Sequence, residues 1–317
     1  MGRRDEIIKN LQAGAAHLAC GDYLRSIGTI NRHSILINAF YDRILRKHAK
    51  TKEIYEHSNE YWNQTMHEMI FRMMDVTVNR AAFEQLARIV PYRIALFEQR
   101  SQFAVEAMLL GASGLLTLYR DDPYILMLKE EFLFLSHKYD LPQMSVKTWK
   151  LHGIRPYNHP AIRLSQIATL LTQKDFLFNE ILDCKTPKDV EQVFNVEASE
   201  YWSSHFVPAD ESYFEIPKRI GREKAYIFGI NIVVPLQYAY GHYIGNDSLI
   251  SRALSLAEDL PAENNVHTRR WARYGVKAAN AFESQGLLQI ATEYCANRRC
   301  AECPVANFIL NKANIDE

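Results

Sequence analysis

Apolar residues recur along most of the chain at intervals of three or four, with polar residues between them, which is the spacing of an amphipathic helix. One such segment begins at Asp122 and Pro123, a capping residue followed by the residue that suits the first helical position. Another runs from Pro160 to Thr172. The apolar run at 225–236 could also form a strand, but it lacks a strand-like partner, so we favour a helix. The sequence predicts an all-α protein with many helices packed in irregular or bundle-like layers.

The length of 317 residues suggests about two domains. We place an N-terminal helical half at residues 1–147 and a C-terminal helical half with a cysteine-rich tail at 148–317, with one continuous domain as the alternative. Hydrophobic residues make up 48% of the chain and charged residues 23%. These values are typical of a soluble globular protein with a substantial core.

Composition also limits the partners and the compartment. The apolar runs at 107–118 and 225–236 fall short of the roughly 20 residues that span a membrane, so we expect no membrane association. Because 37 basic residues balance 37 acidic ones, any binding of nucleic acid must be local. The first ten residues have no apolar signal core, and five cysteines are too few for a secreted disulfide scaffold. We therefore expect a cytoplasmic protein.

The turn that precedes the helix at Pro160 has an unusual composition. Its prolines exclude helix before Pro160, so the chain must form a structured turn there. One interpretation is an anion or phosphate site at a helix N-terminus, with these candidate residues: His152, Arg155, Tyr157, His159 and Arg163. The alternative, which we favour, is that the arginines donate hydrogen bonds to loop carbonyl groups that would otherwise be buried without partners.

A basic helical face is predicted near the C-terminal end. Its members are Arg269, Arg270, Arg273 and Lys277, with Trp271 and Tyr274 close by. Basic residues interleaved with aromatic residues suit single-stranded nucleic acid, because bases stack on the rings. The same pattern suits a surface helix whose aromatic side chains point inward.

The clearest chemical signal is a group of three cysteines near the C-terminus. Cys295, Cys300 and Cys303 follow the spacing C-x4-C-x2-C. Thiolates at such spacings can bind zinc or an iron–sulfur cluster, and Arg298 and Arg299 would lower the pKa values of the thiols. The alternative, which we favour at this point, is that they are reduced cysteines capping a helical core.

A metal at the tail would need a fourth ligand. The spacing is similar to the cluster loop of helix-hairpin-helix DNA glycosylases, but no cysteine follows Cys303 to complete that pattern. Cys20, Cys184 or a histidine could supply the missing ligand. We expect any bound metal to be structural, because a closed thiolate site leaves no open position for substrate.

Three stretches carry a resemblance to a known family. They are residues 155–166, with the sequence RPYNHPAIRLSQ, residues 198–205, with ASEYWSSH, and residues 283–303, from ESQGLLQ to the tail cysteines. The chain resembles the bacterial domain-of-unknown-function family 2851. Longer members look as though they begin with a nuclease-like segment, which we do not find here, so no nuclease chemistry is expected. The resemblance implies a helical fold and no assigned activity.

The residues do not form a complete catalytic triad, acid–base pair, phosphate-binding loop or metalloprotease motif. We therefore predict an uncharacterised helical scaffold or interaction domain with a possible protein partner. One alternative is a nucleic-acid-binding module associated with nucleic-acid processing. A second is an enzyme centred on the turn at 152–163.

Overall fold

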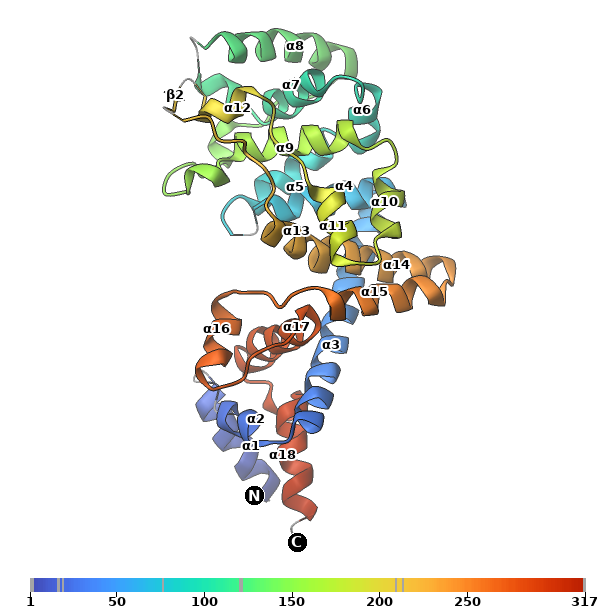
Figure 1. The fold of residues 1–317 in the computed structure, drawn as a ribbon, viewed down its shortest axis with the longest axis vertical. Coiled ribbons are helices and arrows are strands. Elements are labelled where there is room, and N and C mark those ends of the chain that lie inside the picture. The colour runs from blue at the N-terminus through green and yellow to red at the C-terminus, as the bar shows by residue number, and fades with distance from the viewer. Residues whose placement is uncertain are drawn as a thin grey trace. The chain divides into compact units, whose positions relative to one another are not determined.

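The computed structural model of the chain describes residues 3–15, 18, 20–75, 77–119, 122–208, 210–212 and 214–315 (Figure 1). Helices account for most of these residues. Within the same ranges, the strands are confined to one antiparallel pair, β1 (His205–Val207) and β2 (Asp210–Glu211). The predicted all-α, multi-helical class is confirmed.

The helices form two compact units. Unit 1 combines residues 1–50 with residues 238–317, and unit 2 contains residues 51–237. Residues 147 and 148, between which we placed a domain boundary, both lie in unit 2. These compact units do not test the division into 1–147 and 148–317, which stays a prediction.

Unit 1 is built from helices at both ends of the sequence. Its segments are α1 (Arg3–Gly14), α2 (Gly21–Ser26), most of α3 (Thr29–His57), most of α14 (Val234–Ile244), α15 (Asp247–Asp259), α16 (Val266–Arg273), α17 (Ala281–Gln289), the π-helical η6 (Ile290–Cys295), the 3₁₀ turn η7 (Cys300–Glu302) and α18 (Pro304–Ile315). α1 ends at Gly14, and residues 16, 17 and 19 lie outside the described part of the chain. α1 packs against α18.

Unit 2 contains the remaining elements. They are α4 (Trp62–Met74), α5 (Arg80–Ile89), α6 (Tyr92–Phe97), α7 (Gln102–Ala112), η2 (Leu115–Leu118), α8 (Pro123–Tyr139), η3 (Val146–Thr148), η4 (Pro156–Asn158), α9 (Pro160–Gln173), α10 (Leu177–Asp183), α11 (Pro187–Phe194), α12 (Tyr201–Ser204), the two strands, α13 (Arg222–Phe228) and the π-helical η5 (Gly229–Val233). In Figure 1, α7 lies between α8 and α9.

The centre of unit 2 is α7, whose residues from 104 to 112 are all buried. Such a helix must be covered on every side, and α8 and α9 both pack on it. Gly111 permits this approach, because a Cβ atom at that position would overlap the ring of Phe132 on α8. Two residues after the end of α7, Gly114 turns the chain away with a left-handed φ of 77°.

The predicted starts of α8 and α9 are confirmed. Asp122 accepts a hydrogen bond from the Ile125 N–H at 2.9 Å, and Pro123 is the first helical residue. His159 caps α9 in the same way, because its Nδ1 accepts from the Ala161 N–H at 3.3 Å. Both helices therefore begin where their sequence signals predict.

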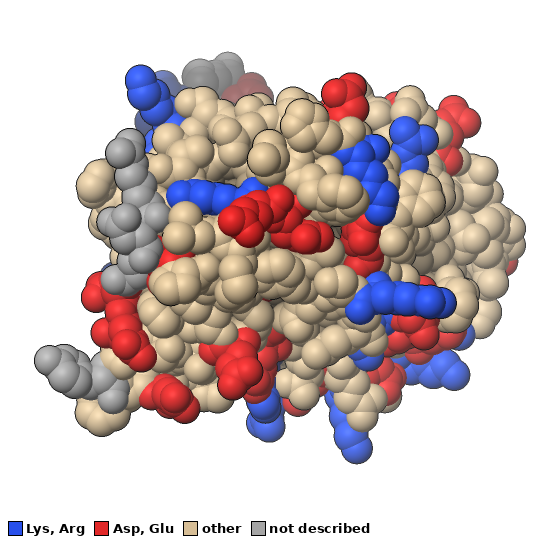
Figure 2. All heavy atoms as spheres, turned by 90° about the horizontal axis from the view of Figure 1, so that it is seen from above, with Lys and Arg blue, Asp and Glu red and all other residues tan. Residues whose placement is uncertain are grey.

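The apolar run at 225–236 is helical, as expected. It comprises α13, the π-helical η5 and the start of α14. No helix in the described part of the chain is long and apolar enough to cross a lipid bilayer. On the face shown in Figure 2, acidic and basic side chains are interspersed, in keeping with the formal net charge of zero.

Gly114 allows a test of the packing around α7. Gly114→Ala should destabilise the protein, because the new Cβ atom would overlap the Met144 carbonyl oxygen and would also force alanine into a left-handed conformation. Gly153 has a similar φ of 74° but no atom within 4 Å of an added Cβ, so Gly153→Ala reports the backbone cost alone.

We expect urea unfolding to show a loss of about 1 kcal/mol for Gly153→Ala, and a loss for Gly114→Ala that is larger by about 1–3 kcal/mol. Equal losses in the two variants would contradict the packing described here.

Candidate functional site

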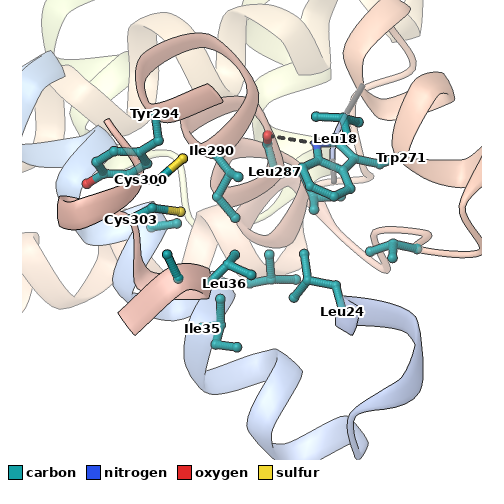
Figure 3. Close-up of a cluster of buried hydrophobic side chains, with 14 of the residues drawn as sticks. Leu18, Leu24, Ile35, Leu36, Trp271, Leu287, Ile290, Tyr294, Cys300 and Cys303 are labelled. Carbon is teal, nitrogen blue, oxygen red and sulfur yellow. Dashed lines mark hydrogen bonds between the residues drawn. The ribbon is translucent and has the colours of Figure 1, made fainter. Parts of the chain in front are cut away.

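Four cysteines that are far apart in the sequence line one small cavity in unit 1. Cys20 lies just before α2, whereas Cys295, Cys300 and Cys303 come from η6, η7 and the start of α18. The cavity has a volume of about 10 Å³, and the rest of its lining is apolar apart from one tyrosine: Leu11, Ala15, Ile290, Tyr294 and Ala306. Figure 3 shows the Cys300 and Cys303 side chains beside Tyr294 at one side of the core of unit 1.

A tight turn brings the tail cysteines together. The π-helical segment ends at Cys295, and Arg298 then adopts a left-handed conformation with a φ of 54°. The turn is closed by a hydrogen bond of 2.8 Å from the Arg299 N–H to the Tyr294 carbonyl oxygen. The chain therefore reverses within a few residues and returns Cys300 and Cys303 to the same cavity.

This turn is held to two other helices of unit 1. The side-chain amide of Gln12 on α1 donates to the Arg298 carbonyl oxygen at 3.0 Å. The Tyr294 hydroxyl donates to the Asp42 carboxylate on α3 at 2.5 Å. Because Tyr294 also lines the cavity, the position of the cysteines is coupled to α3.

The thiols of this cavity favour their protonated form. Burial, followed by the nearby cysteines, raises the pKa of Cys20 and of Cys295 to about 12. Burial is also the main cause that raises the pKa values of Cys300 and Cys303. A cation is therefore needed to convert these thiols to thiolates near neutral pH.

The prediction that Arg298 and Arg299 lower these pKa values is wrong. Arg299 forms an ion pair with Glu302, and the arginine whose charge lowers the pKa of Cys295 is Arg270 on α16. Burial and the repulsion between thiolates together raise the pKa of Cys295 by more than Arg270 lowers it.

Within the described ranges, no three His, Cys, Asp or Glu side chains are positioned closely enough to hold a metal ion. The four cysteine side chains would have to turn toward their common cavity to share one ion. Their donor set fits zinc or iron–sulfur chemistry, because both use cysteine thiolates.

Of the fourth ligands that the sequence left open, the cavity contains Cys20 and neither Cys184 nor a histidine. Cys184 is buried in unit 2, where its thiol donates to the Glu180 carbonyl oxygen at 3.3 Å. The sequence could not single out Cys20, because only the folded chain shows which distant residue lies beside the three tail cysteines.

The predicted basic face lies on α16 and in the loop that follows it. Arg269, Arg273 and Lys277 are exposed, and Arg270 is half-buried. Trp271 is fully buried, and its Nε1–H donates to the Leu287 carbonyl oxygen at 3.1 Å, so it anchors the helix inward.

The predicted turn places its candidate residues in two environments. His152, Arg155 and Tyr157 are exposed. His159 is buried as the cap of α9, and burial lowers its pKa to about 4. Arg163 donates to the Asn158 and Gln166 side-chain oxygens at 2.6 and 2.8 Å. The cap and the arginine bonds fit a structural role for the turn, and an anion site or catalytic centre there stays a prediction.

Glu106 on α7 is a lone carboxylate in an apolar helix, and such a residue is more often partly exposed or paired with an arginine than catalytic. In unit 2 it lies instead in a buried polar network. The Glu106 carboxylate is fully buried and accepts hydrogen bonds from the Trp202 Nε1–H at 2.7 Å and the Ser165 hydroxyl at 2.8 Å. Ser165 in turn accepts from the Ser199 N–H at 2.8 Å. The network joins α7, α9 and α12, and its bonded residues are 34 to 96 positions apart in the sequence, so sequence spacing could not identify it.

A family model described as a protein of unknown function, DUF2851, matches residues 4–266. The chain belongs to the DUF2851 family. No curated protein and no solved structure matches it. The DUF2851 match includes Cys20 and stops before the three tail cysteines. Membership of DUF2851 therefore gives a family without an assigned activity.

Glu106 provides a pH test of the buried network. Burial raises the pKa of Glu106 in the folded state, so the folded protein holds a proton that the unfolded chain releases. The contribution of Glu106 to stability should therefore fall as the pH rises from the unfolded value through the folded value. Glu106→Gln removes this titration.

We expect wild-type protein to lose stability relative to Glu106→Gln as the pH is raised above about 4.5, the usual range for a glutamate. Thermal or urea unfolding of both proteins over a range of pH values measures the difference. A difference that does not change with pH would show that Glu106 does not titrate abnormally.

Proposed function

We propose that this chain is a helical scaffold or interaction domain in which a metal centre of four cysteine thiolates stabilises unit 1. The observation that carries this proposal is that Cys20 lines the same cavity as Cys295, Cys300 and Cys303. These four residues come from two widely separated parts of the sequence, so the fold is what brings them together. It supplies the fourth thiol that the tail lacks.

The chemistry of the cavity supports a thiophilic metal. Four thiolates can complete a tetrahedral zinc site, and four thiolates also hold iron–sulfur clusters. The cavity has room for about one water molecule, so a single ion would require less rearrangement of its lining than a cluster. Metal binding would release the thiol protons, so the affinity for metal should fall as the pH is lowered.

A structural role fits this site better than a catalytic one. Four cysteine ligands leave no open coordination position for a substrate. The other lining residues are mostly aliphatic, so they offer few groups that could act on a substrate. We infer that the metal fixes the tail turn against α1 and α2 and thereby shapes the surface of unit 1.

The exposed side of α8 in unit 2 supports an interaction domain. Four of its large apolar side chains are 45–60% exposed: Leu126, Met127, Leu133 and Phe134. Apolar side chains grouped on the surface of a helix are typical of a protein interface. The five free cysteines and the bacterial family that the sequence resembles suggest a reducing compartment such as a bacterial cytoplasm.

Metal analysis of variants tests the proposed centre. Protein purified without oxygen should contain zinc or iron in a stoichiometric amount, and Cys20→Ser and Cys300→Ser should each lose it. Cys184→Ser is the matched control, because Cys184 is also buried and free but lies outside the cavity.

Elemental analysis and an ultraviolet–visible spectrum distinguish the two metals. Zinc without visible absorption would indicate a single ion, whereas iron with visible absorption and acid-labile sulfide would indicate a cluster. Metal-free wild-type protein that also fails to take up zinc, or to assemble a cluster from iron and sulfide, would refute the proposal. Retention of metal in Cys20→Ser would show that Cys20 is not a ligand.

A second candidate function is contact with nucleic acid through α16. The support is that the charge of Arg270 on α16 is near enough to lower the pKa of Cys295, although burial outweighs this effect. Arg269, Arg273 and Lys277 are exposed and can reach phosphate groups. Because Trp271 is buried, we expect α16 to contact the phosphate backbone of the nucleic acid, with no base stacked on the Trp271 ring.

We expect the double variant Arg269→Gln and Arg273→Gln to bind short oligonucleotides more weakly, with a salt dependence reduced by about two phosphate contacts. Fluorescence anisotropy over a range of salt concentrations measures both effects. Arg4→Gln with Lys9→Gln is the control, because these residues are exposed on α1 of the same unit. If wild-type protein binds no oligonucleotide at low salt, this candidate function is wrong.

A further inference from the structure

A second concave site lies in unit 2, where the end of α3 meets α4, α5 and α6. It is a pocket of about 430 Å³, within the roughly 300–1,000 Å³ that is usual for small-molecule sites. Its lining combines charged groups with apolar surface, chiefly Glu68, Arg88, Arg93, Tyr61 and Pro91. It shares no residue with the cysteine cavity.

One wall of this pocket has an unusual backbone. Asn59, which lines the pocket, and the following Glu60 have φ angles of 54° and 57°. Left-handed conformations cost a residue other than glycine roughly 1–2 kcal/mol, and such strain is often found at functional sites. Here the two residues form part of the short connection between α3 and α4, which contributes Asn59 and Tyr61 to the lining of the pocket.

A buried carboxylate organises the polar side of the pocket. Glu68 is 5% exposed. One of its oxygens accepts from the Ser58 hydroxyl at 3.2 Å and the Gln64 amide at 3.3 Å, and the other accepts from the Arg88 Nε–H at 3.2 Å. Because Glu68 is bound to Nε of Arg88, the terminal nitrogens of this guanidinium remain available to a ligand.

Arg93 adds a second guanidinium group. It is exposed, and it has no hydrogen-bond or ion-pair partner among the residues that the structure describes. With Arg88 and Glu68, it gives the pocket an excess of positive charge. Guanidinium groups bind carboxylate and phosphate through paired N–H donors, so the pocket fits an anionic group.

The apolar side of the pocket indicates the remainder of the ligand. Tyr61 is 40% exposed and lies on the lining with Pro91. A flat apolar body can pack on such a surface while its charged end meets the arginines. A free inorganic ion would leave this part of the pocket unused.

We propose that this pocket binds a small organic anion, with its carboxylate or phosphate group held by Arg88 and Arg93 and its apolar body against Tyr61 and Pro91. This site is independent of the cysteine centre, so either proposal can fail without the other.

Calorimetric titration at low ionic strength tests the site with three probes, which are phenyl phosphate, benzoate and inorganic phosphate. We expect phenyl phosphate or benzoate to bind saturably and more tightly than inorganic phosphate. Arg93→Gln should weaken that binding about tenfold, the effect of losing one charge-assisted contact. Arg100→Gln is the control, because Arg100 is exposed in the same unit but does not line the pocket.

The probes distinguish the two sources of the anion. Tighter binding of phenyl phosphate supports a phosphate monoester, and tighter binding of benzoate supports a carboxylic acid. The proposal is overturned if neither organic probe binds saturably below about 10 mM. It is also overturned if inorganic phosphate binds as tightly as the organic probes, or if Arg93→Gln and Arg100→Gln weaken binding equally in folded protein.

Discussion

The structure of unit 1 depends on the burial of one apolar core by two segments that lie far apart in the sequence. Neither segment can bury its apolar face alone, so each requires the other. α17 approaches α3 so closely that a Cβ atom on Gly286 would lie 2.6 Å from the Leu36 carbonyl oxygen. Nearby, the rings of Phe40 and Phe282 stack with their centroids 3.9 Å apart. Polar contacts then fix the register of the same pair of segments, because Arg46 on α3 donates to Gln289 at 2.6 Å and also pairs with Glu293.

The cysteine cavity is a consequence of this packing. Cys300 and Cys303 belong to the same core, and Cys20 packs against its edge. An ion held by all four thiolates would link the segments across more than two hundred residues of intervening chain. Closing so long a loop is costly in entropy for the unfolded chain, so a link of this kind stabilises the folded state most when the loop is long. The pocket of unit 2 has a different physical basis, since a strained turn and a buried carboxylate contribute to its lining.

Local signals in the sequence were sufficient for much of the fold. Asp122 with Pro123, and His159 with Pro160, set the starts of α8 and α9 because a cap and a proline act within one turn of helix. The three tail cysteines were visible for the same reason. Contacts between residues that are far apart in the sequence could not be predicted in this way. Tertiary packing, which no spacing rule describes, determines that Cys20 and not Cys184 lines the cysteine cavity. It also determines the partners of Glu106 and the pocket around Glu68. Arg43 on α3 illustrates the same limit, because sequence spacing does not show that it donates to Gln285.

X-ray absorption spectroscopy at the edge of the bound metal tests the central claim most directly, because it reports the identity and distance of the ligand atoms. Convergence of the four cysteines predicts a first shell made of sulfur alone, at about 2.3 Å for zinc. An iron–sulfur cluster would add iron–iron scattering to a shell that is still all sulfur. A first shell with nitrogen or oxygen atoms, or with fewer than four sulfur atoms for zinc, would contradict the claim that Cys20 completes the site.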